Sequence, residues 1–446
     1  MDEKHLFSNK MLIALIVPVI LEQVLNSLMG TVDTIMVSNI GSAAISAVSL
    51  VDSINILIIY AFSALATGGA IICAQYVGSR DIGKAEEVAR QLIFIVAVIS
   101  LGVTLICLFF EHSILQFIFG SVENAVMEES MTYFFYTAIS FPFIALYNAG
   151  AAVFRSQENT RGPMLISVSS NLLNIVGNAY LIFVLHMGVR GAAIATLLSR
   201  IYTAVIVLSL LRRKKNKVPV RDYLSIRPNG QIIQHILGLG IPSGVENGMF
   251  QLGKLAIQST VSTLGTTAIA AHAMTSMMEM LNGVAAIGIG IGMMTVVGEC
   301  LGAGRKDEAV YYIKKLSIVA EFVLIACCII VYLCIRPVTV IGSMEAESAR
   351  LCIFMVGYIT VLKPIFWIPS FIPAYGMRAA GDVKFSMIVS MITMWLCRFC
   401  ITVFLIRFMG VGPIAVWIGM SSDWAVRGLI FLWRFHSRKW LKHQVI

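Results

Sequence analysis

The chain carries too few charges to cover the surface of a soluble protein of its length. Of its 446 residues, 58% are hydrophobic and only 13% are charged, and the mean hydropathy is +0.86. This composition excludes a soluble globular protein and predicts an integral membrane protein with many spans. The net charge of +9 would suit nucleic-acid binding, but the positions of the basic residues favour a different interpretation, given below.

The N-terminal segment 1–10 is polar, and the apolar run that follows it is long enough for a full span. We therefore expect no cleavable signal peptide. All nine cysteines lie within or at the ends of apolar segments, without the spacing to histidines that metal sites have. We interpret them as small buried residues, and we expect no cofactor.

Twelve apolar segments are long enough to cross a bilayer, which needs about 20 predominantly apolar residues. They cover residues 11–38, 46–77, 89–110, 128–154, 162–185, 189–211, 235–263, 268–300, 312–335, 350–376, 384–408 and 411–435. We predict the basic stretch 212–234 as a cytoplasmic linker between an N-lobe, 1–211, and a C-lobe, 235–446. The expected fold is an all-α integral membrane protein with twelve transmembrane helices in two six-helix bundles.

The two predicted lobes share an internal repeat. Residues 18–85 align without a gap to residues 242–309, 224 positions later, and 14 of the 68 aligned positions are identical. The shared positions include one proline pair, three glycine pairs and four alanine pairs, together with the pair Glu22 and Glu246. Because each lobe has an even number of spans, both copies enter the membrane in the same direction, which predicts a parallel repeat. Such a repeat is typical of transporters that rock two bundles around a central site.

The distribution of lysine and arginine predicts the orientation in the membrane. With the N-terminus in the cytoplasm, 24 of these residues lie on the cytoplasmic side and four on the opposite side. The positive-inside rule therefore places both termini in the cytoplasm of a cell-membrane protein. Orientation and contact with anionic membrane lipids account for the basic net charge, and we expect no nucleic-acid partner. The outer segment 111–129 is predicted to be an acidic loop.

Polar side chains interrupt the apolar segments of the N-lobe. The polar residues are Glu22, Asn26 and Asp33 in the first span, Asp52 and Asn55 in the second, and Ser167, Asn171, Asn174 and Asn178 in the fifth. Within each span they lie close to one helical face. Polar groups at this depth are costly and cannot face lipid. We therefore expect the three faces to meet inside the N-lobe.

The C-lobe has its own set of polar groups inside the membrane. They are Glu246, Gln251 and Lys254 in the seventh span, His272 and Glu279 in the eighth, Lys363 in the tenth, Arg398 in the eleventh, and Asp423 and Arg427 in the twelfth. Three prolines follow Lys363 and predict a bent or broken tenth helix, whose freed carbonyl groups need a polar cavity. The glycine-rich segment 288–292 lies in mid-membrane and is interpreted as a helix-packing surface, not a nucleotide loop.

Several of these groups have a structural as well as a functional interpretation. Asp423 and Arg427, four residues apart, favour an intrahelical ion pair. His272 fits either a hydrogen-bonded interior residue or a proton relay. The remaining groups either brace the helices or line a substrate cavity. The predicted cavity residues are Glu22, Asn26, Asp52, Glu246, Gln251, Lys254, His272, Glu279 and Lys363.

Asp33 differs from the repeated groups because its equivalent in the second copy is Ile257. The faces around it carry amides and, as far as the sequence shows, no cation. A carboxylate among asparagine side chains is typical of a cation or proton site. We predict ion coupling at Asp33, Asn171, Asn174 and Asn178, with Asp33 as the ligand when the ion is Na⁺.

These residues resemble those of the MATE family of multidrug and toxic-compound extrusion transporters, over nearly the whole chain. The resemblance rests on Pro18 to Asp33 in the first span and on the helix exits Ala74-Gln75-Tyr76-Val77-Gly78 and Gly298-Glu299-Cys300-Leu301-Gly302. It also rests on Leu173-Asn174-Ile175-Val176-Gly177-Asn178 in the fifth span and on Met377-Arg378-Ala379-Ala380-Gly381-Asp382 after the tenth.

The resemblance implies secondary active export of cationic, lipophilic compounds, driven by inward flow of Na⁺ or H⁺, with Asp33 as a coupling residue. The chain departs from one pattern of the family. Some relatives have an aspartate where Asn178 stands, and without it a shared-proton mechanism loses one partner, whereas amide oxygens can still coordinate Na⁺. Other relatives use acidic residues in the seventh and tenth spans. Here Glu246 stands in the seventh span, but the tenth has Lys363 and no acid.

The sequence therefore predicts an alternating-access antiporter that acts as a monomer on small cationic substrates and is not an enzyme. The alternative is a lipid-linked-saccharide flippase of the same wider superfamily, which would need a cationic cavity such as Lys254, Lys363 and Arg398 offer. An intramembrane enzyme is disfavoured because neither two facing aspartates nor an H-E-x-x-H motif is found. A passive channel is disfavoured by the repeat.

Overall fold

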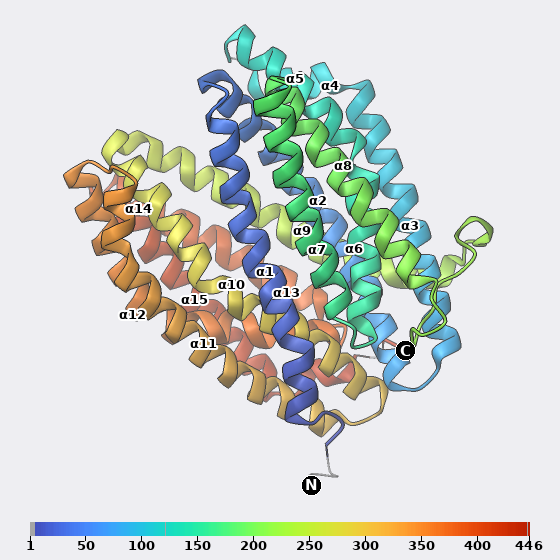
Figure 1. The fold of residues 1–446 in the computed structure, drawn as a ribbon. Coiled ribbons are helices and arrows are strands. Elements are labelled where there is room, and N and C mark those ends of the chain that lie inside the picture. The colour runs from blue at the N-terminus through green and yellow to red at the C-terminus, as the bar shows by residue number, and fades with distance from the viewer. Residues whose placement is uncertain (1–4, 121, 444) are drawn as a thin grey trace. The chain divides into compact units, whose positions relative to one another are not determined.

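The structure is a computed structural model that describes residues 5–120, 122–443 and 445–446 (Figure 1). The described residues form helices joined by short connections and contain no strand. Among the described residues, ten helices are long and apolar enough to cross a membrane, and the bent pair α5 and α6 adds an eleventh when it is counted as one span. α9 (Gly230–Val261) does not pass this test of composition, but its 32 residues extend about 48 Å at 1.5 Å per residue, which is longer than the hydrocarbon core of a bilayer. The predicted all-α membrane fold is confirmed.

The chain divides into two compact units, residues 25–244 and residues 1–24 with 245–446. The first unit contains the second half of α1 (Asn9–Ser38), α2 (Ser42–Gly78), α3 (Ile82–Phe109), α4 (Glu111–Phe119), α5 (Asn124–Ile139), α6 (Phe141–Ser156), α7 (Arg161–Asn178), the π-helical segment η1 (Ala179–Val184), α8 (Gly188–Leu211), the short 3₁₀ turn η2 (Tyr223–Ser225) and the first half of α9. Within this unit α2 packs against α3, α5 and α6, and α8 packs against α5, α6 and α7.

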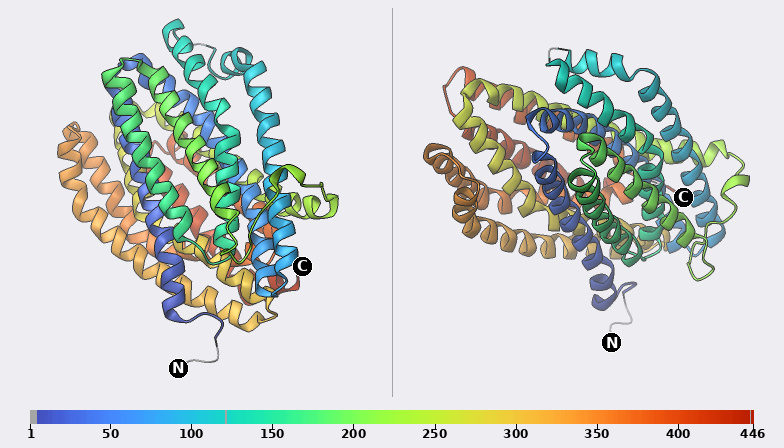
Figure 2. Two further views of the ribbon diagram at one scale, coloured as in Figure 1. Left: turned by 45° about the vertical axis from the view of Figure 1, so that its right-hand side comes forward. Right: turned by 45° about the horizontal axis from the view of Figure 1, so that its top comes forward.

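The second unit contains the first half of α1, the second half of α9 and the helices that follow it. These are η3 (Ser262–Leu264), α10 (Thr266–Gly302), α11 (Lys306–Ile341), α12 (Ala346–Ala379), α13 (Val383–Thr393), the π-helical segment η4 (Met394–Cys400), α14 (Ile401–Arg407), α15 (Ile414–His436) and η5 (Lys439–Lys442). Its centre is α10, which packs against α11 and α12, while α15 packs against α12. Figure 2 shows α11 and α12 running side by side in both views.

The repeat predicted from the sequence recurs in the helices. α2 and α10 begin and end at equivalent positions, 224 residues apart, and α3 and α11 begin at equivalent positions. Both α2 and α10 follow a glycine with positive φ, 141° at Gly41 and 95° at Gly265. With ψ near 170° at both positions, this backbone conformation is essentially restricted to glycine. The two copies therefore enter their second helix through the same turn.

Glycines also allow the first halves of α1 and α9 to pack closely within their compact units. A Cβ at Gly68 of α2 would lie 2.6 Å from the carbonyl oxygen of Ile236 and 2.8 Å from the nitrogen of Gly240, so this helix touches the first half of α9. At the equivalent place in the other unit, a Cβ at Gly292 of α10 would lie 3.0 Å from the side chain of Ile16 in the first half of α1. The first halves of α1 and α9 are thus each packed within the unit built mainly from the other half of the chain.

Glycine permits the close helix contact expected at segment 288–292. A Cβ at Gly288 would lie 2.8 Å from Cα of Ile20, and one at Gly290 would lie 2.5 Å from the ring of Tyr375. Larger side chains at these two positions would separate α10 from α1 and α12. The prediction of a packing surface is borne out by these distances.

Three local predictions need correction. The predicted fourth span, 128–154, is broken into α5 and α6 with a bend of 43°, where Pro142 stands in the first turn of α6. The predicted acidic loop 111–129 contains the helix α4 and the start of α5. The tenth span was predicted to be bent or broken at its prolines, and the second alternative is wrong, because α12 is one continuous helix over all three of them.

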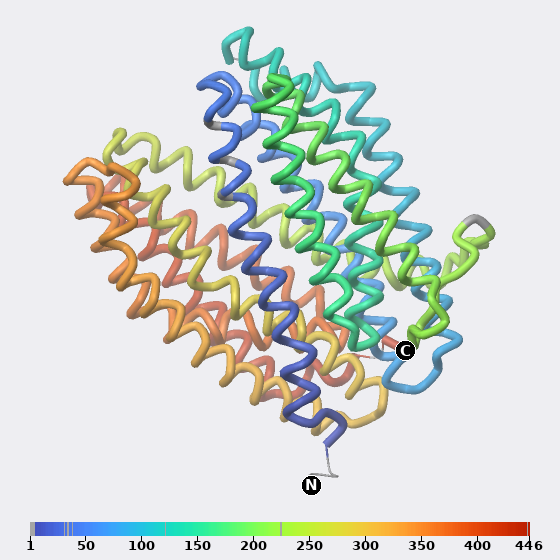
Figure 3. The backbone as a smooth tube through the Cα atoms, in the orientation of Figure 1, coloured from blue at the N-terminus to red at the C-terminus, as the bar shows by residue number. Residues whose placement is uncertain are grey.

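The linker 212–229 leaves the helices as a loop and returns to α9 (Figure 3). Its polar groups bind the unit of residues 25–244. The hydroxyl of Tyr223 donates a hydrogen bond to the carbonyl oxygen of Leu208 at 2.7 Å, and burial raises the pKa of Tyr223 to about 12. The side chain of Gln91 donates to the carbonyl oxygen of Arg227 at 2.7 Å and accepts from the backbone of Asn229 at 3.1 Å. The predicted division into an N-lobe, 1–211, and a C-lobe, 235–446, separated by the linker 212–234, remains a prediction. The two compact units divide the chain at other places, after residues 24 and 244.

Candidate functional site

The first candidate site joins α1 to α7 within the unit of residues 25–244. Asp33 of α1 accepts a hydrogen bond on Oδ1 from Nδ2 of Asn178 at 3.1 Å. Nδ2 of Asn178 also lies 3.1 Å from Oδ1 of Asn174, one turn earlier. Asn174 in turn donates to Oγ1 of Thr196 in α8, at 3.5 Å. The structure therefore brings together three of the four predicted coupling residues.

Asn178 is the most deeply buried member of this set, with 2% of its side chain exposed. Its Oδ1 has no hydrogen-bond partner among the described residues. A buried amide oxygen without a donor costs free energy comparable to a lost hydrogen bond. Asn178 is also the last residue before the π-helical segment η1, and such segments occur frequently at functional sites. An unsatisfied oxygen beside a carboxylate is the arrangement that a bound cation would complete.

A second group of polar side chains lies on the same two helices. Oδ1 of Asn26 accepts hydrogen bonds from Ser167 at 2.6 Å and from Asn171 at 3.0 Å. The fourth predicted coupling residue, Asn171, is thus bonded to Asn26 and not to Asp33. Glu22 belongs to the first half of α1, which is grouped with the other unit. The prediction that Glu22 meets Asn26 and Asp33 inside the N-lobe is therefore wrong, because α1 is shared between the units.

The predicted absence of a cation near Asp33 is also wrong. Asp33 and Asp52 both lie within electrostatic range of Arg200 on α8, whose guanidinium donates to Oγ of Ser140 at 2.7 Å. Asp52 accepts hydrogen bonds on Oδ1 from Asn55 at 3.1 Å and from the hydroxyl of Tyr133 at 3.3 Å. Sequence reasoning missed Arg200, Tyr133 and Thr196, although a single arginine in an apolar span was a signal for the first of them.

In the other unit, the predicted cavity residues Glu279 and Lys363 form an ion pair. The ammonium of Lys363 lies 2.5 Å from Oε1 of Glu279. It also lies 2.8 Å from the Glu279 carbonyl oxygen and 2.5 Å from Oδ1 of Asn282. An ammonium has three donors, and these three acceptors satisfy it. Lys363 is 1% exposed, so this pair joins α12 to α10 in the interior of the unit.

A second buried cluster joins η4 to α15. Asp423 lies 2.7 Å and 2.9 Å from Nη2 of Arg427, four residues later. Its Oδ2 also lies 2.8 Å from Nη2 of Arg398. The predicted intrahelical pair is thus present and shares its carboxylate with a second guanidinium. All three side chains are almost fully buried.

The other predicted residues of this unit have separate surroundings. Glu246 pairs with Arg378 at 2.6 Å, which ties α9 to the end of α12. His272 is buried, with Nε2 3.5 Å from Oγ of Ser276 and its ring 5.7 Å from that of Trp417. Lys254 is exposed and Gln251 is half-buried on α9. Their predicted roles in substrate binding remain predictions.

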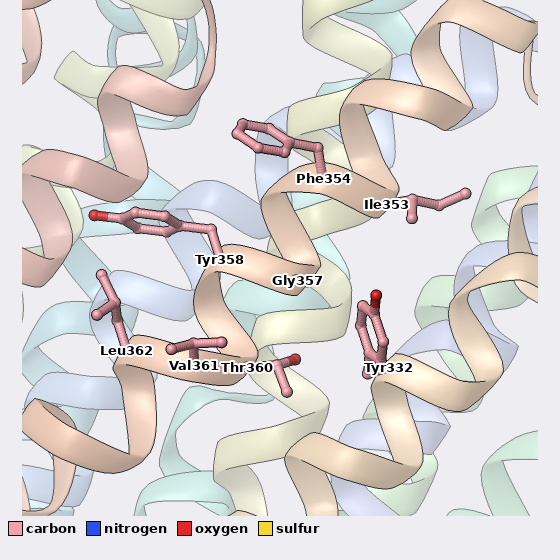
Figure 4. A pocket seen from close by; sticks show the side chains of 8 residues that line it. All are labelled: Tyr332, Ile353, Phe354, Gly357, Tyr358, Thr360, Val361 and Leu362. Carbon is pink, nitrogen blue, oxygen red and sulfur yellow. The ribbon is translucent and has the colours of Figure 1, made fainter.

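A surface groove of about 650 Å³ lies between α11 and α12 (Figure 4). Tyr332 projects from α11, and Ile353, Phe354, Gly357, Thr360 and Val361 line it from α12. None of the predicted site residues lines this groove. Its walls are mostly apolar and exposed, as expected where membrane-spanning helices meet lipid.

Among the described residues, no group of three or more histidine, cysteine, aspartate or glutamate side chains could hold a metal ion. The oxygen-rich set around Asp33 is of a different kind, with one carboxylate, amides and a hydroxyl. Two helical units with charged and amide groups inside their membrane-spanning helices define the class of polytopic membrane transporters.

The sequence profile of the MatE family matches residues 18–180 and again residues 242–404. The second match begins 224 residues after the first, as the internal repeat requires. The chain belongs to the MatE family, a family of transporters and not of enzymes.

Relatives match the chain over nearly its full length. The "Probable multidrug resistance protein NorM" of Thermotoga maritima is 27% identical, with 98% of this chain and 94% of the relative covered. A crystal structure of "MATE in complex with MaL6" is 22% identical with a TM-score of 0.88, covering 96% of this chain and 97% of that one. A structure described as "Outward-facing conformation of a multidrug resistance MATE family transporter of the MOP superfamily" is 21% identical with a TM-score of 0.87, covering 96% of each chain. These structures share the fold.

Proposed function

We propose that the protein exports cationic or lipophilic compounds across the cell membrane by alternating access, coupled to inward movement of Na⁺ through Asp33. The observation that carries this proposal is the buried Oδ1 of Asn178, which has no hydrogen-bond partner among the described residues and belongs to the side chain that donates to Asp33. The family membership and the name of the Thermotoga maritima relative support the export of drugs.

The residues around Asp33 suit a cation that prefers oxygen ligands. A carboxylate, the amide oxygens of Asn174 and Asn178 and the hydroxyl of Thr196 are hard donors. Na⁺ sites in transporters use such oxygens where helices are irregular, and η1 begins immediately after Asn178. When Na⁺ binds, its charge is neutralised by Asp33, and the amide of Asn178 reorients to present its oxygen.

The membrane potential adds to the driving force. Inward movement of one net positive charge releases about 2.3 kcal/mol per 100 mV. We propose that binding at Asp33 favours one conformation of the transporter and that substrate binding favours the other, which is the requirement for coupled exchange. We further propose that the protein is a monomer with both termini in the cytoplasm and that it contacts anionic lipids through its basic cytoplasmic segments.

The flippase alternative is not favoured. Of the three basic residues that supported it, Lys363 and Arg398 are ion-paired with Glu279 and Asp423. The name of the Thermotoga maritima relative also points to drug resistance. Only Lys254 remains without an ion pair among the described residues.

The test is dye transport in proteoliposomes with Na⁺ and pH gradients imposed separately. We expect ethidium to move against its gradient when a Na⁺ gradient is applied at equal pH. Transport driven only by the pH gradient would assign the coupling to H⁺. Dye movement that only follows its own gradient under both conditions would contradict active export.

A further inference from the structure

One cluster of charged side chains in the unit containing residues 245–446 holds more positive than negative charge. It consists of four cations and two carboxylates that lie within electrostatic range of one another, namely Lys254, Lys363, Arg398, Arg427, Glu279 and Asp423. Lys254 lies within electrostatic range of Glu279, Arg398 and Lys363. Like charges gathered at short range in a membrane-spanning unit are costly unless an anion lies among them.

Neither carboxylate forms an ion pair with Lys254 among the described residues. Glu279 is occupied by Lys363, which also uses the carbonyl oxygen of Glu279 and Asn282 for its other donors. Asp423 is shared by Arg398 and Arg427, so one carboxylate serves two guanidiniums. One positive charge of this pair, together with Lys254, is left without a counter-ion among the described residues.

Arg398 is incompletely satisfied. Its side chain is 2% exposed, and its Nε has no hydrogen-bond partner among the described residues. The guanidinium of Arg427, in contrast, donates from Nε to Thr393 at 3.2 Å and from Nη2 to Asp423. A buried guanidinium with an unused donor is the kind of group that recognises an oxyanion.

Lys254 and Arg398 lie against the same aromatic ring. The ammonium of Lys254 is 5.2 Å from the centre of the Phe250 ring, and the guanidinium carbon of Arg398 is 4.7 Å from it. Lys254 has no ion pair in the part of the chain that the structure describes, and its side chain is exposed. A lysine ammonium in a membrane-spanning helix does not face hydrocarbon, so we expect Lys254 to face a water-accessible surface of its unit.

We propose that Lys254 and Arg398 bind the carboxylate of a lipophilic substrate. The apolar body of the substrate then lies against Phe250, which packs with Trp395 and Phe399 on an apolar cluster of the same unit. Arg398 lies within the π-helical segment η4, an irregularity that is frequent at functional sites. This inference rests on the proposed export function and refines its substrate class. The preferred compounds carry a carboxylate as well as a cationic or aromatic body.

Two rhodamine dyes that differ at one group test the inference. Rhodamine 19 has a free carboxylate, and rhodamine 6G is its ethyl ester. Dissociation constants for both are measured by fluorescence anisotropy with the purified full-length protein in phosphatidylcholine nanodiscs. We expect the wild type to bind rhodamine 19 about tenfold more tightly, the usual effect of one or two charge-assisted hydrogen bonds. Lys254→Met should bring the ratio of the two constants close to one, and Lys254→Arg should keep it.

The matched control is Lys384→Met, which removes a lysine exposed at the start of α13 and should leave the ratio unchanged. Equal affinity of the wild type for the two dyes, or an unchanged ratio in a monodisperse Lys254→Met protein, would overturn the inference. Loss of the preference in nanodiscs that contain phosphatidylglycerol would also overturn it, because the site would then bind lipid headgroups. Na⁺-driven export of rhodamine 6G by the wild type tests the proposed function separately, since this dye lacks the carboxylate.

Discussion

Asn178 donates a hydrogen bond to Asp33, with Nδ2 3.1 Å from Oδ1. The other end of the same amide, Oδ1, is buried without a partner among the described residues. The donor of Asn178 therefore stabilises the carboxylate in the absence of an ion, and its oxygen is available once an ion is present. The proposed coupling mechanism depends on this pair.

Replacing Asn178 by aspartate should change the coupling ion. Asn178→Asp places a second carboxylate beside Asp33, and two like charges at hydrogen-bond distance share one proton. We expect ethidium transport by this variant to be driven by a pH gradient and to lose most of its response to Na⁺. Proteoliposome transport under each gradient measures the change.

Asn171→Asp is the matched control for that substitution. Asn171 lies on the same helix but is bonded to Asn26, so the new carboxylate does not adjoin Asp33. We expect the Na⁺ response of this variant to be retained. An identical response in the two aspartate variants would show that the position next to Asp33 has no special role.

Asp423 should be essential for stability. It is the shared counter-ion of Arg398 and Arg427 in the interior of its unit. Asp423→Asn leaves two buried guanidiniums without a carboxylate, and loss of one partner of a buried ion pair costs about 3–5 kcal/mol. We expect a clear fall in the unfolding temperature of the detergent-solubilised protein, measured by intrinsic tryptophan fluorescence.

Asp307→Asn provides the comparison for this measurement. Asp307 pairs with Arg438 at 3.1 Å, but both side chains are mostly exposed, and exposed pairs contribute little to stability. Its unfolding temperature should equal that of the wild type. If Asp423→Asn were equally harmless, the assignment of Asp423 as a structural counter-ion would be wrong.

Adding a side chain at either of the two turn glycines should lower the stability of the protein. Gly41 and Gly265 have φ of 141° and 95°, and a Cβ at either position would meet nothing within 4 Å. The cost of Gly41→Ala or Gly265→Ala is therefore backbone strain, about 1–3 kcal/mol each. Gly102→Ala in α3 is the control, since it also has open space but no positive φ. It should be neutral or slightly stabilising, and thermal unfolding of all three variants tests this order.

The linker should become more accessible when Tyr223 loses its hydroxyl. Tyr223→Phe removes the hydrogen bond to the carbonyl oxygen of Leu208 while keeping the ring. The neighbouring segment 212–217 contains five lysine and arginine residues, which are trypsin sites. We expect faster tryptic cleavage there in the folded variant than in the wild type, detected by electrophoresis and mass spectrometry. Equal cleavage rates would mean that this hydrogen bond does not restrain the linker.

Most membrane-spanning helices could be predicted from the sequence, because they are long apolar runs. The internal repeat also shows the first two helices of each half of the chain twice. The repeat also placed Gly41 and Gly265 at the same turn before the structure showed their positive φ. The predicted seventh span, 235–263, lies within α9, although Glu246, Gln251 and Lys254 make this helix more polar than the other long helices. The break between α5 and α6 was missed because Pro142 lies inside an uninterrupted apolar run.

The candidate site was only partly predictable. Helical periodicity placed Asn174 and Asn178 on one face and correctly predicted that this face meets Asp33. It could not show that Thr196 and Arg200 of α8 complete the surroundings, because the rotation of one helix against another depends on packing across the whole interface. The separation of Glu22 from Asp33 arises because α1 passes from one compact unit to the other, and a pattern within one helix carries no information on that.

The most direct test of the proposed coupling is Na⁺-driven ethidium transport by Asp33→Asn in proteoliposomes. This substitution keeps the size of the side chain and one oxygen that can accept the hydrogen bond from Asn178, and it removes the negative charge that would bind Na⁺. We predict that the variant inserts and folds like the wild type but no longer moves ethidium against its gradient. Transport at the wild-type rate by the folded variant would contradict the assignment of Asp33 as the coupling residue.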